Sequence, residues 1–250
     1  MFDLTILAIL QGVAEFLPIS SSGHLVIGQS LLGVNEAGMR LDLMLHVGTL
    51  LSIFVFYRRT IWRIISNFEF AYVAKVAVSA IPACLVYFLF KGFVDSLFEN
   101  AKMVGALLMF TGAVLSSTRF MPRGAKDVSF PRALWMGCGQ ALAILPGVSR
   151  SGMTLAFARS GKVDPEKSAE FSFLMSAPLI MGGMLLDLMK GDAPQESVFG
   201  WGELIFGALL AAVVGYFALA VLVKALKGRW FWLFGPYCMI AGLATLIFLK

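Results

Sequence analysis

The feature that most constrains this sequence is the repetition of long apolar runs along its whole length. Several of them, including residues 41–57, 70–90 and 203–223, reach the roughly 17–25 residues that an α-helix needs to cross a bilayer core. Only 14% of the residues are charged and 59% are hydrophobic, whereas about a quarter of a soluble domain is charged. We therefore predict an all-α polytopic membrane protein.

Polar breaks divide the chain into helical segments whose order repeats. The expected segments are residues 3–17, 23–32, 41–57, 70–90, 102–118, 133–145, 152–160, 168–189, 203–223 and 231–249. The first two flank a break at residues 18–22, and the segments 133–145 and 152–160 flank a second Pro-Gly-Ser break. Each broken pair is followed by three long runs. This order predicts about six transmembrane helices plus two re-entrant helix pairs.

The basic residues give an independent check on this layout. If the break at Arg58, Arg59 and Arg63 is cytoplasmic, most of the 20 lysines and arginines fall on the cytoplasmic side, as the positive-inside rule requires. This excess of lysine and arginine on the cytoplasmic side is obtained only if each broken pair is a re-entrant hairpin that returns to the side from which it entered. The first pair would enter from outside and the second from the cytoplasm. We therefore expect an inverted-topology repeat of residues 1–118 and 130–250 within one membrane domain, with the broken tips meeting near the midplane.

The first break carries ionisable side chains that are costly at membrane depth unless they line a cavity. Gln11 and Glu15 are four residues apart, so they share one helix face. Glu15 can act as a nucleophile, a general base or a ligand for a divalent cation, or it can be a structural carboxylate bonded to a helix end. His24, just past the break, can exchange a proton near neutral pH or be structural.

Three consecutive serines, Ser20, Ser21 and Ser22, lie inside this break. They can cap the helix that begins near Gly23, because serine accepts hydrogen bonds from the first amides of a helix. They can also supply a nucleophile or hydrogen bonds to phosphate oxygens. The free N–H groups of that helix start favour an anion.

The second break, LPGVSRSGMT at residues 145–154, places Arg150 between Ser149 and Ser151. A guanidinium stays charged and binds phosphate through two N–H groups. The alternative is a buried ion pair with Glu15 that ties the two repeats together. Thr154 adds a hydroxyl or bonds back to its own helix. Taken together, the two breaks indicate a site for a phosphate ester.

The remaining polar and sulfur-containing residues suggest no other chemistry. We expect His46 to be an interior histidine with satisfied hydrogen bonds, and Cys84, Cys138 and Cys238 to be packing residues within apolar runs. The sequence has no P-loop and no dinucleotide glycine motif. Its basic loops are short and separate, so we expect no nucleic-acid partner.

Over essentially its whole length, the sequence resembles the undecaprenyl-diphosphate phosphatase family, the integral-membrane type linked to bacitracin resistance. One family motif begins with an acidic residue or glutamine, continues with any three residues and ends with glutamate. It matches residues 11–15. The other, Pro-Gly-x-Ser-Arg-Ser-x-x-Thr, matches residues 146–154. The serine cluster with Gly23-His24 and the segment at residues 42–50 also match.

The resemblance implies that a C55 polyprenyl diphosphate is hydrolysed to the monophosphate and inorganic phosphate. It implies catalytic roles for Glu15, His24 and Arg150, with Ser21 as the candidate nucleophile. Further substrate contacts would come from Gln11, Ser20, Ser22, Ser149, Ser151 and Thr154.

The resemblance also implies a divalent cation, Mg²⁺ or Ca²⁺, near Glu15 and Gln11. Gln11 stands where many members have glutamate, which weakens any mechanism that needs two carboxylates on the metal. The enzyme would lie in the bacterial cytoplasmic (inner) membrane as a multi-pass protein with its active site facing the periplasm. There it would recycle the lipid carrier of cell-wall synthesis. A homodimer is a further expectation.

A transporter is the competing class, because inverted repeats with broken helices are also a carrier's architecture. A lipid-phosphate flippase would use the same residues for binding alone. Glu15 with His24 favours hydrolysis, because a carrier of anionic phosphate gains little from a nearby carboxylate.

Overall fold

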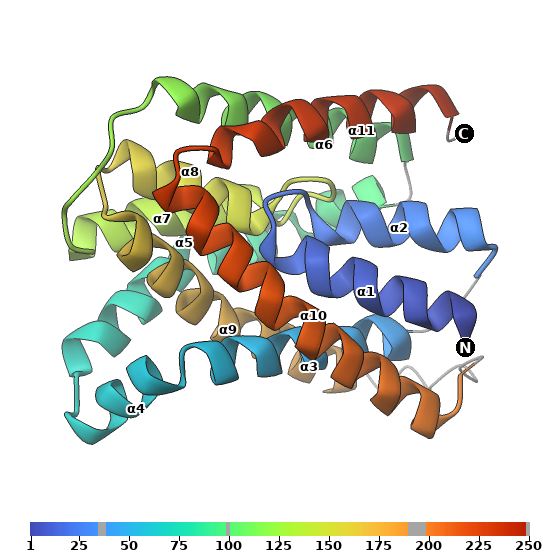
Figure 1. Ribbon diagram of the computed structural model, residues 1–250, viewed down its shortest axis with the longest axis horizontal. Helices are drawn as coiled ribbons and strands as arrows, with labels where there is room; N and C mark the ends of the chain where they lie inside the picture. Colours follow the sequence, from blue (N-terminus) through green and yellow to red (C-terminus); the bar gives the residue numbers. More distant parts are fainter. Residues whose placement is uncertain (35–38, 99–100, 190–198, 249–250) are drawn as a thin grey trace.

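The computed structural model describes the whole chain except residues 35–38, 99–100, 190–198 and 249–250 (Figure 1). The described part is helical and contains no β-strand. Its elements are α1 (Phe2–Phe16), α2 (Ser21–Leu32), α3 (Met39–Phe56), α4 (Arg58–Ser66), α5 (Phe70–Phe98), α6 (Ala101–Ser117), η1 (Thr118–Phe120), α7 (Phe130–Leu142), α8 (Arg150–Ser160), α9 (Pro165–Met189), α10 (Trp201–Lys227), η2 (Phe231–Leu233) and α11 (Phe234–Phe248).

Within the described residues, four helical segments are long and apolar enough to cross a membrane: Phe70–Phe90, Lys102–Phe120, Trp201–Lys227 and Phe231–Phe248. A fifth is obtained if the bent pair α3–α4 counts as one span. The expected all-α, multi-pass architecture is confirmed. The expected number of about six spans is not confirmed by the described residues.

Helix α4 occupies a stretch that we predicted to be a break. Arg58, Arg59 and Arg63 alternate with apolar side chains at helical spacing, and none of the residues of α4 is buried. The axis of α4 is bent by 68° from that of the preceding segment, Arg40–Phe56. A short basic amphipathic helix of this kind is typical of a membrane surface.

Helix packing brings the two broken pairs, α1–α2 and α7–α8, together in the interior. Helix α1 packs against α10, α7 packs against α5, and α6 runs along α11 (Figure 1). Since lipid is as apolar as the side chains, close contact between small residues holds such helices together. Gly48 of α3 illustrates this: a Cβ there would lie 2.1 Å from the carbonyl oxygen of Ala208 in α10.

A shared apolar core surrounds the point where the breaks meet. Phe16, at the end of α1, makes an edge-to-face contact with Phe173 of α9, with ring centres 5.5 Å apart. Both rings are fully buried, as are Leu108 of α6 and Phe231 of η2. Side chains from four separate elements therefore fix the end of α1, directly before the first break.

Candidate active site

The first break is a strained turn held by its own serine. Helix α1 ends at Phe16, and Pro18 prevents its continuation. Ser20 has a φ of 71°, an unfavourable value for a residue with a side chain, and strain of this kind concentrates at functional sites. Its hydroxyl oxygen accepts a hydrogen bond from the Gly23 amide at 3.4 Å. The expected capping role is therefore confirmed for one serine, and Ser21 follows directly as the first residue of α2.

The second break is fixed by α6. The Ser149 side chain caps α8 by accepting a hydrogen bond from the Gly152 amide at 3.1 Å. Gly147 has a φ of 90°, and a Cβ there would lie 2.4 Å from the Val104 carbonyl oxygen, so only glycine fits. Thr111 of α6 donates a hydrogen bond to the Gly147 carbonyl and accepts one from the Ser149 amide, both at 3.1 Å. No sequence signal pointed to this role, because Thr111 lies in an apolar run without a motif.

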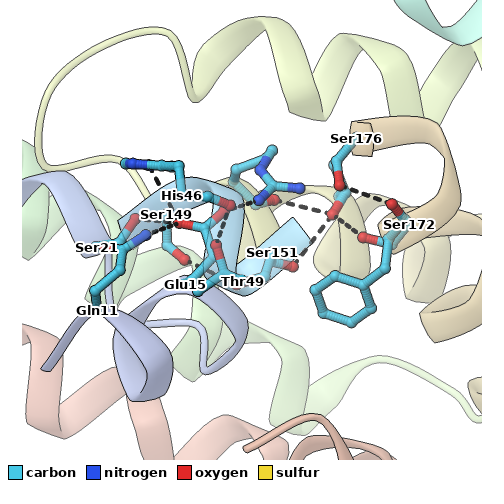
Figure 2. Close-up of polar contacts among 12 residues, drawn as sticks. Gln11, Glu15, Ser21, His46, Thr49, Ser149, Ser151, Ser172 and Ser176 are labelled. Carbon is cyan, nitrogen blue, oxygen red and sulfur yellow. Dashed lines mark hydrogen bonds and ion pairs between the residues drawn. The ribbon is translucent and has the colours of Figure 1, made fainter. Parts of the chain in front are cut away.

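The two breaks meet at the carboxylate of Glu15, a residue that is only 6% exposed (Figure 2). Arg150 Nη2 forms an ion pair with Oε1. Ser21 Oγ donates a hydrogen bond to Oε2 at 2.7 Å, and Gln11 Nε2 donates to the same oxygen at 3.2 Å. The ion pair considered as the structural alternative is thus present, and the same carboxylate also accepts a hydrogen bond from the Ser21 hydroxyl.

The histidine near Glu15 is His46, not His24. His46 Nε2 lies 3.7 Å from Glu15 Oε2, and its Nδ1 bonds the Asp42 carbonyl at 2.7 Å. From the sequence we favoured an interior histidine over a direct chemical role, since an isolated histidine in an apolar run does not reveal which neighbour it faces. The available signal for a role at the site was that His46 lies in the segment of residues 42–50, which matches the family.

His24 takes a different position. Its Nδ1 bonds the Ser20 carbonyl at 2.9 Å, and its Nε2 bonds the Tyr237 hydroxyl at 2.8 Å. The ring also stacks on Tyr237, with centroids 5.7 Å apart. Within the described residues, His24 makes no hydrogen bond or ion pair with Glu15. It therefore links the strained residue Ser20 to α11.

A cavity of about 210 Å³ opens at the meeting point. Its polar lining is Glu15, Ser20, Ser21, Ser22, His46, Ser149 and Arg150. Three of the expected substrate contacts, Ser20, Ser22 and Ser149, are in this lining, whereas Gln11, Ser151 and Thr154 are not. Ser151 Oγ donates to the Leu17 carbonyl at 3.3 Å, and Thr154 Oγ1 donates to the Arg150 carbonyl at 2.9 Å. These two hydroxyls support the backbone around the cavity.

Two buried polar atoms at this point have no hydrogen-bond partner among the described residues: Arg150 Nη1 and Gln11 Oε1. Buried polar groups are normally paired, so an unpaired one calls for an explanation. A guanidinium with one N–H group on Glu15 and another unused can still bind an anion. Ser21 beside Glu15 is a hydroxyl next to a base, the arrangement of an activated nucleophile.

The donor set suits a cation only in part. The described residues hold no group of three or more His, Cys, Asp or Glu side chains able to bind a metal. Mg²⁺, however, is commonly held by one or two carboxylates together with substrate phosphates. Glu15 supplies one carboxylate and Gln11 Oε1 an unused oxygen. Glu15 therefore fits a cation that a diphosphate also helps to hold, whereas Gln11, which lies outside the cavity lining, would have to turn toward the cavity to contribute.

Comparisons with known proteins agree with this geometry. A model of the family described as bacitracin resistance protein BacA matches residues 4–244. An undecaprenyl-diphosphatase of Desulforapulum autotrophicum is 35% identical over 99% of this chain and 98% of its own length. Undecaprenyl-diphosphatase 4 of a Bacillus cereus strain is 39% identical over 97% of this chain and 94% of its own length. An undecaprenyl-diphosphatase of Desulfosudis oleivorans is 38% identical over 96% of this chain and 96% of its own length. These matches include both breaks, and the chain belongs to the bacitracin resistance protein BacA family.

Proposed function

We propose that this protein hydrolyses undecaprenyl diphosphate to undecaprenyl phosphate and inorganic phosphate. The observation that carries the proposal is the hydrogen bond from Ser21 to Glu15 at 2.7 Å, beside Arg150 and on the wall of one cavity. Relatives 35–39% identical over nearly the whole chain bear the name of this activity. No contact among the described residues favours transport. The product would re-enter peptidoglycan synthesis as the lipid carrier, and its renewed supply would confer resistance to bacitracin.

The geometry supports a stepwise reaction. The terminal phosphate enters the cavity, and the guanidinium of Arg150, which lines the cavity, neutralises part of its charge. Ser21 Oγ forms a bond to phosphorus while its proton passes to Glu15, and the bond from phosphorus to the bridging oxygen breaks. Undecaprenyl phosphate leaves with that oxygen and the bonding electron pair. Water then splits the phosphoserine, and Glu15 returns the proton to Ser21. In the alternative route Glu15 activates water directly, and Ser21 forms no covalent bond.

We further propose that Glu15 and Gln11 contribute to holding Mg²⁺ or Ca²⁺ in the substrate complex. A bound divalent cation would neutralise charge on the diphosphate oxygens. The unpaired Gln11 Oε1 supports this assignment.

The architecture that we propose around this site is an inverted repeat of residues 1–118 and 130–250. Its support is reciprocal packing: the first helix of each half, α1 or α7, packs on a long helix of the other half, α10 or α5. The clustering of basic residues at one end supports an orientation with that end in the cytoplasm. We propose a place in the inner membrane with the cavity facing the periplasm, as the family resemblance implies. A homodimer remains an expectation.

Phosphate release from C55 diphosphate by the purified protein in detergent tests the proposal, with Mg²⁺ in one series and EDTA in another. We expect turnover by the wild type and losses of at least about 100-fold in Glu15→Gln and Arg150→Ala, the size typical of removing one charge-stabilising group. Asp127→Asn, which removes a carboxylate on the surface, is the matched control. A folded wild type without turnover would contradict the proposal and make transport in liposomes the next assay.

A further inference from the structure

Four arginines from separate segments gather around the C-terminal end of α8. Arg119 lies in η1, Arg123 in the loop that follows, Arg159 near the end of α8, and Arg229 in the turn after α10. Arg159 Nη2 donates a hydrogen bond to the Met121 carbonyl at 3.2 Å, which ties α8 to the loop carrying Arg123. Figure 1 shows the ends of α6, α8 and α10 at this one end of the molecule. We call these four residues the arginine cluster.

The arginine cluster has no acidic partner within the part of the chain that the structure describes. None of its guanidinium groups forms an ion pair with a described residue, although acidic side chains pair with basic ones elsewhere. Arg159 Nε is buried, and no described residue hydrogen-bonds to it. Burial, together with the charges of Arg229 and Arg123, lowers the pKa of the Arg159 guanidinium. Repulsion among like charges would be relieved by a bound anion.

The neighbours of the cluster indicate where that anion comes from. The Arg119 guanidinium lies 4.6 Å from the centre of a Trp232 ring. Phe120, beside it in the chain, is 85% exposed, and Leu233 is 49% exposed. Tryptophan and exposed apolar side chains next to cations are typical of the boundary between lipid headgroups and acyl chains. A lipid fits this surface better than an ion from solution does.

We propose that the arginine cluster binds the phosphate of an anionic phospholipid headgroup from the surrounding leaflet. Guanidinium groups bind phosphate oxygens through paired N–H donors, and basic clusters near the ends of membrane helices attract anionic lipids. The site is separate from the catalytic cavity, because Arg150 and Arg159 are nine residues apart on α8, about 14 Å along a helix. The bound headgroup would stabilise the joined ends of α6, α8 and α10.

Thermal unfolding in lipid nanodiscs tests this site, comparing phosphatidylcholine alone with phosphatidylcholine plus phosphatidylglycerol. We expect phosphatidylglycerol to raise the wild-type midpoint by about 2–4 °C, a modest ligand effect for a chain of this length. Native mass spectrometry should show retained phosphatidylglycerol. The double variant Arg123→Gln/Arg229→Gln should lose both responses. Arg58→Gln/Arg59→Gln, which removes two exposed arginines from α4, should keep them.

Three outcomes would overturn the proposal. The first is an undiminished response to phosphatidylglycerol in Arg123→Gln/Arg229→Gln. The second is an equal loss in the α4 control, which would indicate attraction by overall charge. The third is the same rise with inorganic phosphate in phosphatidylcholine nanodiscs, lost in the cluster variant, which would indicate a site for free anions. If the double variant fails to fold, Arg123→Gln alone is compared with Arg58→Gln in the same way.

Discussion

Glu15 has different partners on its two carboxylate oxygens. The ion pair with Arg150 stabilises a buried negative charge that would otherwise be very unfavourable. The other oxygen accepts a hydrogen bond from the Ser21 hydroxyl and lies 3.7 Å from His46 Nε2. The ion pair therefore favours the ionised carboxylate, and the second oxygen accepts hydrogen bonds from Ser21 and Gln11. In the proposed reaction Arg150 would have two tasks, one toward Glu15 and one toward the substrate, and a forked side chain suits both.

Arg150→Lys tests this double role. Lysine keeps the positive charge but presents a single point of contact, so it cannot hold Glu15 and a phosphate in the same way. We expect kcat/KM for C55 diphosphate to fall by at least about 100-fold, the order of one lost transition-state donor. Arg59→Lys on the exposed surface of α4 is the control. Near-normal activity in folded Arg150→Lys would show that charge alone suffices.

The two histidines contact different partners, and we propose a chemical role for His46 and a supporting role for His24. His46 touches Glu15, whereas His24 joins Ser20 to Tyr237. We expect His46→Ala to lower kcat by roughly 10- to 100-fold, within the range of lost proton-transfer assistance, and to leave the unfolding midpoint nearly unchanged. His24→Ala should lower the midpoint as well as the activity, because the Ser20 turn and Tyr237 lose a shared partner. These midpoints are measured in detergent. A lowered midpoint for His46→Ala with an unchanged midpoint for His24→Ala would reverse the two assignments.

Among the elements, the two breaks matter most because each ends a helix and begins the next within a few residues. Ser20 and Ser149 cap α2 and α8 in the same way, so each helix begins at the site. Thr111 holds the second break from α6, and His24 with Tyr237 holds the first break to α11. Since α6 and α11 pack along each other, the pair acts as a common support for both breaks.

Gly147→Ala tests how rigidly the second break is fixed. The added Cβ would collide with the Val104 carbonyl at 2.4 Å in a backbone conformation that alanine avoids. We expect a loss of stability of about 1–3 kcal/mol, and a loss of activity because the loop leading to Arg150 is displaced. Gly202→Ala, where a Cβ meets open space, is the control for the unfolding measurement. Equal unfolding midpoints for the two variants would show that the loop accommodates the added methyl group without loss of stability.

The elements that local chemistry determines could be predicted from the sequence. Pro18 stands in the first break and Pro146-Gly147 in the second, so both breaks and most helix ends were located. Helix α4 was not identified, because its basic residues were interpreted as a loop and only their helical spacing shows otherwise. The position of His46 could not be predicted, because contact with Glu15 depends on how α3 rotates against α1, and the local sequence does not determine that rotation.

At the scale of the whole molecule, the two ends of the bundle would lie on opposite sides of the membrane. Basic α4 and the arginine cluster would face the cytoplasm, and the end of α2 would lie on the outer side. Cysteines introduced one at a time into a background in which Cys84, Cys138 and Cys238 are replaced by serine test this with a membrane-impermeant maleimide. We expect Leu31→Cys, which is exposed at the end of α2, to be labelled in intact cells, and Arg59→Cys only after lysis. The reverse result would invert the orientation.

Trapping of a phosphoenzyme tests the central claim most directly. Wild type, Ser21→Ala and the control Ser30→Ala, which alters an exposed serine of α2, would each be mixed with C55 diphosphate, quenched within one turnover and analysed by mass spectrometry. We predict phosphate on Ser21 in the wild type and in Ser30→Ala, with neither phosphate nor turnover in folded Ser21→Ala. Full turnover by Ser21→Ala would contradict this mechanism and assign the attack on phosphorus to water.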